Sequence, residues 1–385
     1  MTIPNAAAMI AAMSALSAVL TAAPAHADYR QKAEEQTDYI QTHFYDAKTY
    51  RYRSRVPVDP KELPYDFMWA NGVQFTVLAA AAHENPKKYK TALYEFTHGL
   101  ESYWDPKPKS GPSGYNAYCS GPGGTDKYYD DNEWLVLGLV EAYEATKNPN
   151  FLKKARATQK FVLSGWDSKL DGGVYWKLDR KSKNTCSNTP ASAAALRLYQ
   201  VGHDKAQLSW ALKIRKWTKD KLQDSDGLYW DNIDLKGKVE KTKWTYNTGL
   251  AIRTDVLLYQ MQGDKKALAE ARRMADAGLA QWTDPKTGSL HKTEGSALFT
   301  HLFCESLLRL YDVTRDIKYL DAVRSEAAFA YEHVRDPDGG YWNEAKHKPN
   351  ERKKLIENAA AARLFWLLTP YPETGTPAKA AKKTV

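Results

Sequence analysis

The sequence predicts an all-α protein whose helices form an (α/α)6 toroid of six helical hairpins. Apolar residues recur with helical spacing along nearly the whole chain, and strand signals are confined to short Tyr-Trp pieces inside loops. Short, punctuated turns alternate with long connections rich in Gly, Pro and Asp. A Gly-Tyr-Trp motif recurs in the long connections at a spacing of roughly 50–60 residues. A repeated hairpin that cannot bury its apolar face alone accounts for all of these observations.

The helices differ in composition according to their expected layer. Those at 149–165, 205–222, 264–282 and 317–334 carry many charged residues, as an outer layer with one solvated face does. Those at 189–202 and 354–369 are rich in Ala, which lets helices approach closely in an inner ring. The remaining expected helices, in chain order, are 29–43, 66–84, 86–103, 131–147, 245–262 and 294–314.

All six inner helices are expected to begin after a long loop, so their N-terminal ends should meet at one mouth. Loops at one end of a rigid scaffold are where functional residues usually lie. We therefore expect an active-site cleft there. Polar, aromatic and Gly-rich stretches occur at these starts: Trp69-Ala70-Asn71-Gly72, Asp130-Asp131-Asn132-Glu133, Asn184-Thr185-Cys186-Ser187-Asn188, Thr245-Tyr246-Asn247-Thr248-Gly249, Thr293-Glu294-Gly295 and Glu357-Asn358.

The two ends of the chain differ from its middle. Residues 1–27 are apolar, lack charged side chains and end in Ala25-His26-Ala27, which is typical of a cleaved signal peptide. We expect one catalytic domain over 28–370 and a disordered basic tail over 371–385. Because no later segment is apolar enough to span a membrane, the sequence predicts an exported protein, periplasmic or secreted.

Composition argues against several classes of partner. The chain has a net charge of +9 but no compact basic cluster with a base-reading motif, so no nucleic acid is expected. The nine His residues show no metal-ligand spacing, and we expect neither a metal nor another cofactor. Three cysteines (Cys119, Cys186 and Cys304) leave at least one thiol unpaired. A Cys119–Cys186 bridge stays open, and we expect a monomer.

The stretch Tyr128-Tyr129-Asp130-Asp131-Asn132-Glu133-Trp134 allows two interpretations. In the first, Asp130 and Glu133 form a capping box at a helix start. In the second, two carboxylates with different pKa values share a glycosidase cleft, one ionised and the other protonated. Aromatic rings beside them and a load of 12 Trp and 24 Tyr suit a carbohydrate site. A Mg²⁺-diphosphate site is less favoured because no second acidic cluster faces the pair.

Four ordered blocks resemble those of glycoside hydrolase family 76, the endo-α-1,6-mannanases and their fungal cell-wall relatives. The first is the Tyr128–Trp134 stretch, and the resemblance covers essentially the whole chain after residue 27. One departure is Phe299-Thr300-His301-Leu302-Phe303, where the family pattern resembles Phe-Lys-Gly-Ile-Phe. The other three blocks are Gly172-Gly173-Val174-Tyr175-Trp176-Lys177, Lys183-Asn184-Thr185-Cys186-Ser187-Asn188 and Trp244-Thr245-Tyr246-Asn247-Thr248-Gly249.

The resemblance implies an (α/α)6 fold and retaining hydrolysis of α-1,6-mannosidic linkages in α-mannan. It implies that Asp130 is the nucleophile and Asp131 the general acid/base. An open mouth built of loops would favour cleavage inside the glycan chain. The residues expected to bind the sugar are Trp69, Tyr128, Tyr175, Trp176, Asn188, Trp230, Asp231, Tyr246 and Asn247.

Three alternatives remain open from the sequence. A transglycosylase would use the same covalent intermediate with a sugar acceptor in place of water. A glycan-binding protein on the same scaffold would not need a proton donor beside a nucleophile, so the Asp130–Asp131 pair argues against it. An epimerase or an unsaturated uronyl hydrolase would share the toroid. For an epimerase we would expect His at the mouth, where only His291 and His301 lie near predicted inner-helix starts.

Overall fold

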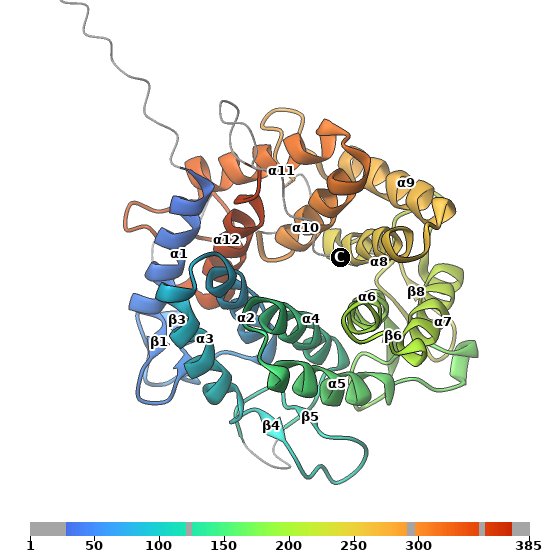
Figure 1. Cartoon of the computed structure of the whole chain (residues 1–385), viewed down its shortest axis with the longest axis horizontal. Helices are drawn as coiled ribbons and strands as arrows, with labels where there is room; N and C mark the ends of the chain where they lie inside the picture. Colours follow the sequence, from blue (N-terminus) through green and yellow to red (C-terminus); the bar gives the residue numbers. More distant parts are fainter. Residues whose placement is uncertain (1–27, 121–124, 291–296, 346–350, 372–385) are drawn as a thin grey trace, which may run out of the picture.

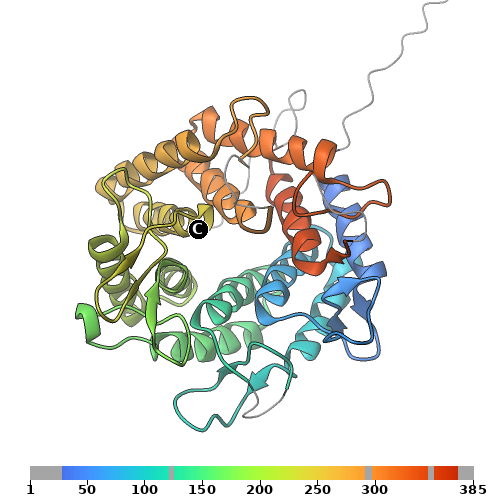
Figure 2. The same ribbon diagram turned by 180° about the vertical axis from the view of Figure 1, so that it is seen from behind.

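The computed structural model describes residues 28–120, 125–290, 297–345 and 351–371. In this part of the chain twelve α-helices form two concentric rings (Figures 1 and 2). The inner ring comprises α2 (Met68–Glu84), α4 (Tyr129–Thr146), α6 (Thr185–Gly202), α8 (Thr245–Gln262), α10 (Ala297–Thr314) and α12 (Leu355–Leu368). The outer ring comprises α1 (Tyr29–His43), α3 (Pro86–Leu100), α5 (Pro149–Leu163), α7 (Lys205–Leu222), α9 (Lys265–Trp282) and α11 (Ile317–Phe329).

Helix packing closes the inner ring. Each inner helix packs against the next one along the chain, and α12 packs against α2. Five inner helices also pack against the outer helix that follows them, whereas α12 packs against α1. Between α1 and α12, Gln36 Nε2 donates to Asn358 Oδ1 at 2.9 Å, and Trp366 Nε1 donates to Thr37 Oγ1 at 2.9 Å. The predicted (α/α)6 toroid is therefore confirmed.

The composition of each layer matches its burial. Inner helices are buried over most of their length, as in α6, where Ala191, Ala193, Ala194 and Ala195 are fully covered. Outer helices bury one face only; in α9 this face includes Ala267, Ala271 and Met274. The assignment of Ala-rich helices to the inner ring and charged helices to the outer ring is confirmed.

The helix boundaries follow local capping signals. Outer helices α5, α7, α9 and α11 begin after Asn148, Asp204, Asp264 and Asp316, whose side chains accept hydrogen bonds from the first free N–H groups. One prediction is too long, because α11 ends at Phe329 and Ala330–Val334 continue as a π-helical turn. That turn leads into the Gly-rich loop before α12.

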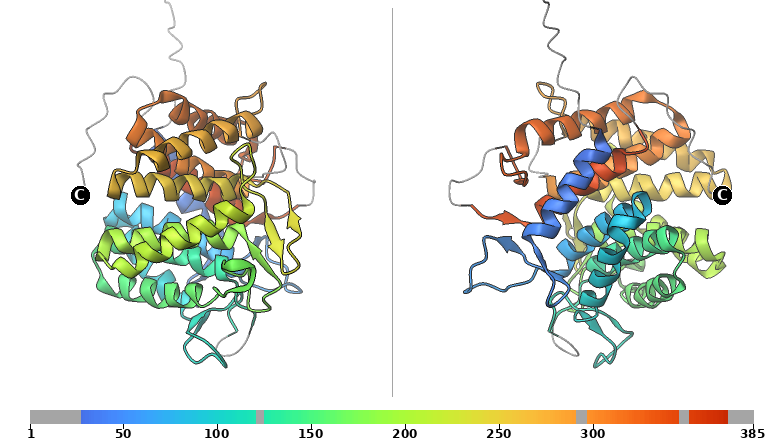
Figure 3. Two further views of the ribbon diagram at one scale, coloured as in Figure 1. Left: turned by 90° about the vertical axis from the view of Figure 1, so that its right-hand side faces the viewer. Right: turned by 60° about the vertical axis from the view of Figure 1, so that its left-hand side comes forward.

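Short strands occur in the long loops, which gather at one end of the ring (Figure 3). The largest sheet has the antiparallel order β6-β7-β8. A second pairing, β3 with β9, ties an early loop to the start of α12. The strands are β1 (Tyr45–Asp46), β2 (Arg51–Tyr52), β3 (Arg55–Val56), β4 (Trp104–Asp105), β5 (Gly114–Tyr115), β6 (Ser182–Asn184), β7 (Asn232–Asp234), β8 (Val239–Glu240) and β9 (Lys353–Lys354).

Charged side chains meet beneath the mouth, between the inner helices. Glu305 of α10 accepts from Arg253 of α8 at 3.0 Å and from Arg363 of α12 at 3.2 Å. Arg363 also pairs with Glu141 of α4 at 2.9 Å. Since Glu305, Arg253 and Arg363 are each at most 4% exposed, a solvent-shielded ion network links four inner helices.

Some predicted segments lie outside the described residues. These are the expected signal peptide at 1–27, the tail from residue 372 and the stretch Thr293-Glu294-Gly295. Among the described residues, no helix is both long enough and apolar enough to cross a membrane.

Candidate active site

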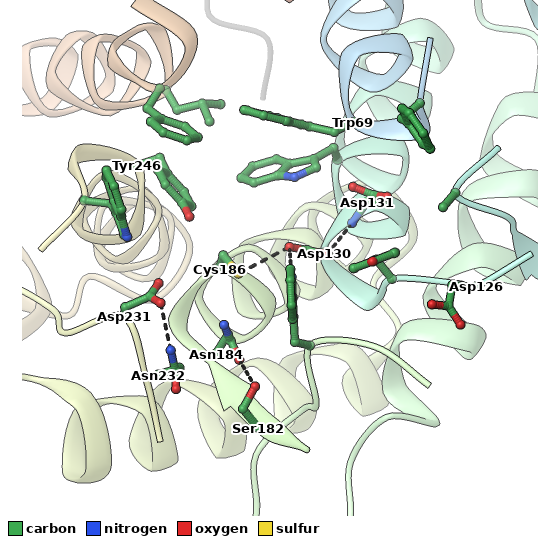
Figure 4. A pocket seen from close by; sticks show the side chains of 18 of the residues that line it. Trp69, Asp126, Asp130, Asp131, Ser182, Asn184, Cys186, Asp231, Asn232 and Tyr246 are labelled. Atoms are coloured by element: carbon green, nitrogen blue, oxygen red, sulfur yellow. Dashed lines mark hydrogen bonds between the residues drawn. The ribbon is translucent and has the colours of Figure 1, made fainter. Parts of the chain in front are cut away.

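A cavity of about 790 Å³ lies at the end of the ring where the inner helices begin. Its walls come from the first turns of five inner helices and from the loops before them (Figure 4). Its volume falls within the range of pockets that bind small molecules, about 300–1,000 Å³. The lining residues are Phe67, Trp69, Ala117, Tyr118, Thr125, Asp126, Tyr128, Asp130, Asp131, Trp134, Trp176, Ser182, Asn184, Cys186, Asp231, Asn232, Trp244, Tyr246, Phe299 and Leu302.

Asp130 and Asp131 lie inside the first turn of α4. The helix begins at Tyr129, whose N–H donates to the carbonyl of Trp176 at 2.8 Å. Tyr128 is the N-cap residue and makes no side-chain cap bond. Both carboxylates thus project from the positive end of a helix, where negative charge is stabilised.

The predicted capping box is wrong. Asp130 lies one residue too far into the helix to be the N-cap, and its Oδ1 accepts the N–H of Asp131 at 2.9 Å. Glu133 is fully buried, and among the described residues neither of its carboxyl oxygens has a hydrogen-bond partner. It therefore cannot reach back to cap the helix.

Two donors fix the second oxygen of Asp130. Trp176 Nε1 donates to Asp130 Oδ2 at 2.9 Å, and Cys186 Sγ donates to the same atom at 3.3 Å (Figure 4). Trp176 comes from the loop before α6 and Cys186 from the first turn of α6. The neighbouring hairpin thus holds the Asp130 carboxylate in place.

The environment separates the pKa values of the two aspartates. Burial raises the pKa of Asp130 to about 6, against the hydrogen bonds from Cys186, the Asp131 N–H and Trp176, which lower it. Burial and the adjacent charge of Asp130 raise the pKa of Asp131 well above its ordinary value. One carboxylate can therefore be ionised at neutral pH while its neighbour keeps a proton, as acid/base catalysis requires.

Polar groups line the wall beside α6 and α8. Asn232 Nδ2 donates to Asp231 Oδ2 at 2.8 Å, and Ser182 Oγ donates to Asn184 Oδ1 at 2.6 Å (Figure 4). Burial raises the pKa of Asp231. These groups come from the β6-β7-β8 sheet and the loop before it, and they suit the hydroxyl groups of a sugar.

Aromatic rings cover much of the remaining wall. The Phe299 ring centroid lies 5.3 Å from that of Trp69 and 4.6 Å from that of Tyr246, in near-parallel stacks. On another side, the Tyr128 and Trp176 rings meet edge to face at 5.1 Å. Flat apolar faces next to hydrogen-bonding groups are what a pyranose ring requires.

The structure places seven of the eleven predicted site residues at the cavity. Besides the two aspartates, these are Trp69, Tyr128, Trp176, Asp231 and Tyr246. The other four, which do not line it, are Tyr175, Asn188, Trp230 and Asn247.

The buried members of this second set support the loops. Tyr175 is fully covered and its hydroxyl donates to Asp167 at 2.8 Å. Asn188 clamps the loop before α6, since its amide bonds both the N–H and the carbonyl of Val174 at 2.8 Å. Asn247 is also fully buried. Asn188 therefore acts on the cavity through the backbone that it positions, whereas the Asn247 amide acts on Asp231, whose pKa it lowers.

Trp230 contacts the start of α6 through its backbone. Its carbonyl accepts a hydrogen bond from Thr185 Oγ1, at the first residue of α6. Its indole lies beneath the Lys241 ammonium, 5.1 Å from the ring centroid. The Trp230 side chain is partly buried and does not line the cavity.

Several lining residues were not predicted as site residues. Two signals in the sequence could have found some of them: a position beside a predicted helix start, and a position directly after a Tyr-Trp motif. They are Phe67, Ala117, Tyr118, Thr125, Asp126, Trp134, Ser182, Asn184, Cys186, Asn232, Trp244, Phe299 and Leu302.

No disulfide is formed, because Cys119, Cys186 and Cys304 are all free. Within the described ranges, no group of three or more His, Cys, Asp or Glu side chains is arranged to hold a metal ion. The described lining of the cavity offers carboxylates, amides, hydroxyls, the Cys186 thiol and aromatic rings.

A helical toroid with paired carboxylates and aromatic walls at its mouth suits the chemistry of a glycosidase. Residues 28–308 match the family model described as glycosyl hydrolase family 76, and the chain belongs to this family. The expectation that the chain belongs to family 76 is confirmed.

Known relatives and structures show the same relationship. A GH76 α-mannanase of Bacteroides thetaiotaomicron is 26% identical, with a TM-score of 0.82 over 89% of this chain and 95% of that one. The meiotically up-regulated gene 191 protein of Schizosaccharomyces pombe is 28% identical over 57% of this chain. Mannan endo-1,6-alpha-mannosidase DCW1 of Candida glabrata is 26% identical over 35% of this chain. The chain spans 58% and 34% of the lengths of these two fungal proteins.

Proposed function

We propose that this glycosidase hydrolyses α-1,6-mannosidic linkages in α-mannan with retention of anomeric configuration, and that it cleaves inside the chain. The observation that carries the proposal is the pair Asp130 and Asp131, held in one cavity with pKa values that differ in the required direction. The α-1,6-mannan specificity rests on the relatives described as α-mannanase and as mannan endo-1,6-alpha-mannosidase.

In the first step the two aspartates act together on the glycosidic bond. The protonated Asp131 gives its proton to the leaving oxygen while the Asp130 carboxylate attacks the anomeric carbon. The C–O bond to the leaving sugar breaks, and a covalent glycosyl ester forms on Asp130. The hydrogen bonds from Trp176 and Cys186 hold the attacking carboxylate of Asp130 in a fixed orientation.

In the second step a water molecule releases the sugar. Asp131, now ionised, takes a proton from the water as its oxygen attacks the anomeric carbon. The ester bond to Asp130 breaks, and both aspartates return to their starting protonation states. Two inversions at the same carbon give net retention.

A transglycosylase is the second candidate, because it shares the first step. The apolar wall of Trp69, Phe299 and Tyr246 favours this reading to the extent that it binds an acceptor sugar and excludes water. Hydrolysis remains the main proposal because the polar wall at Asp231 and Asn232 can also hold water.

We also propose that the enzyme acts outside the cytoplasm. The support is the pattern of residues 1–27, an apolar segment followed by the small-residue motif Ala25-His26-Ala27. A mannan polymer is itself an extracellular material, which agrees with export.

The test is digestion of linear α-1,6-mannan, with product anomers followed by NMR at early times. The wild type should release α-anomers, and Asp130→Ala and Asp131→Ala should each lose several orders of magnitude in kcat. Asp126→Ala is the matched control, since Asp126 lines the same cavity but is exposed and paired with Lys177. It should stay within a few-fold of wild type.

Each alternative result of this experiment would favour a different function or mechanism. Release of β-anomers would sink the retaining mechanism. Full activity in either of the Asp130 and Asp131 variants would remove the pair from the chemistry. Mannan binding without any cleavage would favour a binding protein, and longer products formed from short oligosaccharides would favour a transglycosylase.

A further inference from the structure

Phe299, in the first turn of α10, lies between two aromatic rings from other inner helices. Its plane is tilted 17° from that of Trp69 and 28° from that of Tyr246. All three rings line the cavity, and each is only partly buried despite the stacking. A ring that served the core alone would be fully covered, as Phe303 is one turn further along α10. The stack therefore keeps an accessible surface toward the cavity.

The stack crosses one sector of the mouth. In the inner ring, α12 lies between α2 and α10. Trp69 belongs to α2 and Phe299 to α10, so their contact bridges the two helices that flank α12. Within the described ranges, five inner helices contribute residues to the cavity, and neither α12 nor the loop before it does. Among the described residues, the stack therefore bounds the cavity on the side of α12.

The two sides of the cavity offer different chemistry. Toward α6 and α8, Asn184, Asp231 and Asn232 present amide and carboxylate groups. Toward α12, the rings of the stack present apolar surface. At the start of α12, Lys354 Nζ pairs with Glu357 Oε1 at 2.8 Å. A sugar chain meets hydrogen-bonding groups on one side and an apolar wall on the other.

Building on the mannan hydrolysis proposed above, we propose that Phe299 is a specificity-determining residue. With Trp69 and Tyr246 it forms a wall that limits how many sugar units bind on the α12 side of the cleaved bond. Units beyond the wall turn out of the cavity into solvent and gain no contacts. A short oligosaccharide then binds best with one end against the wall, whereas a long polymer is still cut internally.

The experiment uses linear α-1,6-mannooligosaccharides of increasing length, labelled at the reducing end, with products resolved by mass spectrometry. In the wild type, one cleavage position should dominate at every length, counted from the same chain end. Phe299→Ala should lower its dominance over neighbouring positions by about tenfold, the upper range for one aromatic contact. Phe299→Trp, which keeps a stacked ring, should keep the wild-type pattern.

Phe329→Ala is the matched control, because it removes a phenyl ring from the outer helix α11. It should leave the cleavage pattern unchanged. Thermal unfolding shows whether Phe299→Ala is folded; if it is not, Phe299→Leu, which keeps apolar volume without a ring, carries the same expectation. If the Phe299 variant is folded and active but keeps the wild-type cleavage pattern, the proposed role of Phe299 is refuted and the proposed mannan hydrolysis is not affected. A wild type that cleaves none of these oligosaccharides overturns the proposed function and the wall with it.

Discussion

Replacing Trp176 by Phe removes one donor from Asp130 and keeps an aromatic ring at the cavity. The lost bond, 2.9 Å from Nε1 to Oδ2, favours the ionised carboxylate. A hydrogen bond to a charged group contributes about 1.5–3 kcal/mol. Because Trp176 is 37% exposed and solvent screens the bond, the lower value applies. At about 1.4 kcal/mol per pKa unit, the pKa of Asp130 should rise by about one unit.

The sign follows from the role of Asp130. A nucleophile acts only when ionised, so a higher pKa moves the acid limb of the pH profile to higher pH. In the profile of kcat/KM, which reports the free enzyme, the limb should move from near the wild-type pKa, about 6, to about one unit higher. At pH values below both limbs the variant should be about tenfold slower than wild type, with a much smaller difference above them.

The assay is hydrolysis of a short α-1,6-mannooligosaccharide between acid and neutral pH. Trp230→Phe is the matched control, because its indole does not line the cavity. It should leave the limb in place. If Trp176→Phe keeps the wild-type limb, then the acid limb does not report Asp130, and the assignment of Asp130 as the ionised nucleophile fails.

Two further predictions concern groups that touch the pair or lie beneath it. Cys186→Ala removes the other side-chain donor to Asp130, so the acid limb of the kcat/KM profile should move to higher pH. Cys186→Ser keeps a donor, and its acid limb should stay near that of the wild type. If the two variants have the same acid limb, this prediction is contradicted. Burial and the charges of Asp130 and Asp131 raise the pKa of Glu133, so the contribution of Glu133 to the free energy of unfolding should fall as pH rises above its unfolded-state pKa of about 4.3. The free energy of unfolding, measured in urea against pH, should fall less steeply in Glu133→Gln, by up to about 1.4 kcal/mol per pH unit. Glu332→Gln, at an exposed position, should keep the wild-type slope. An unchanged slope in Glu133→Gln would refute the prediction.

Local patterns predict the scaffold well. The expected helices at 29–43, 205–222 and 245–262 coincide with α1, α7 and α8. Helical periodicity and N-cap residues such as Asp204 are contained in a few neighbouring residues. The layer of each helix is also readable, because a solvated face needs charge and close inner packing needs Ala.

The site is less readable because distant contacts decide its details. The capping box failed since the carbonyl of Trp176, far along the chain, accepts the Tyr129 N–H and begins the helix one residue before Asp130. Asn188 lies one helical turn beyond the Asn184 start, and its amide is consumed by the backbone of Val174. Neither partner can be inferred from periodicity.

Phe299 is a cavity residue that the local sequence pattern would assign to the core. An aromatic residue in an apolar helical run reads as core, and Phe303 four residues later is indeed buried. What distinguishes Phe299 is contact with Trp69 on α2 and Tyr246 on α8. Only the closed ring brings these three helices to one mouth.

The pairing of the first helix with the last sets an order of events in time. Gln36 and Asn358, which bond across α1 and α12, are separated by 322 residues of chain. At about 5–20 residues per second, synthesis takes roughly 15–65 s to cover that span. Throughout this interval the apolar face of α1, including Ala33 and Ile40, lacks α12, the helix against which α1 packs most extensively. The toroid therefore completes its fold only when the last helix emerges, and until then the growing chain depends on whatever keeps that face from aggregating.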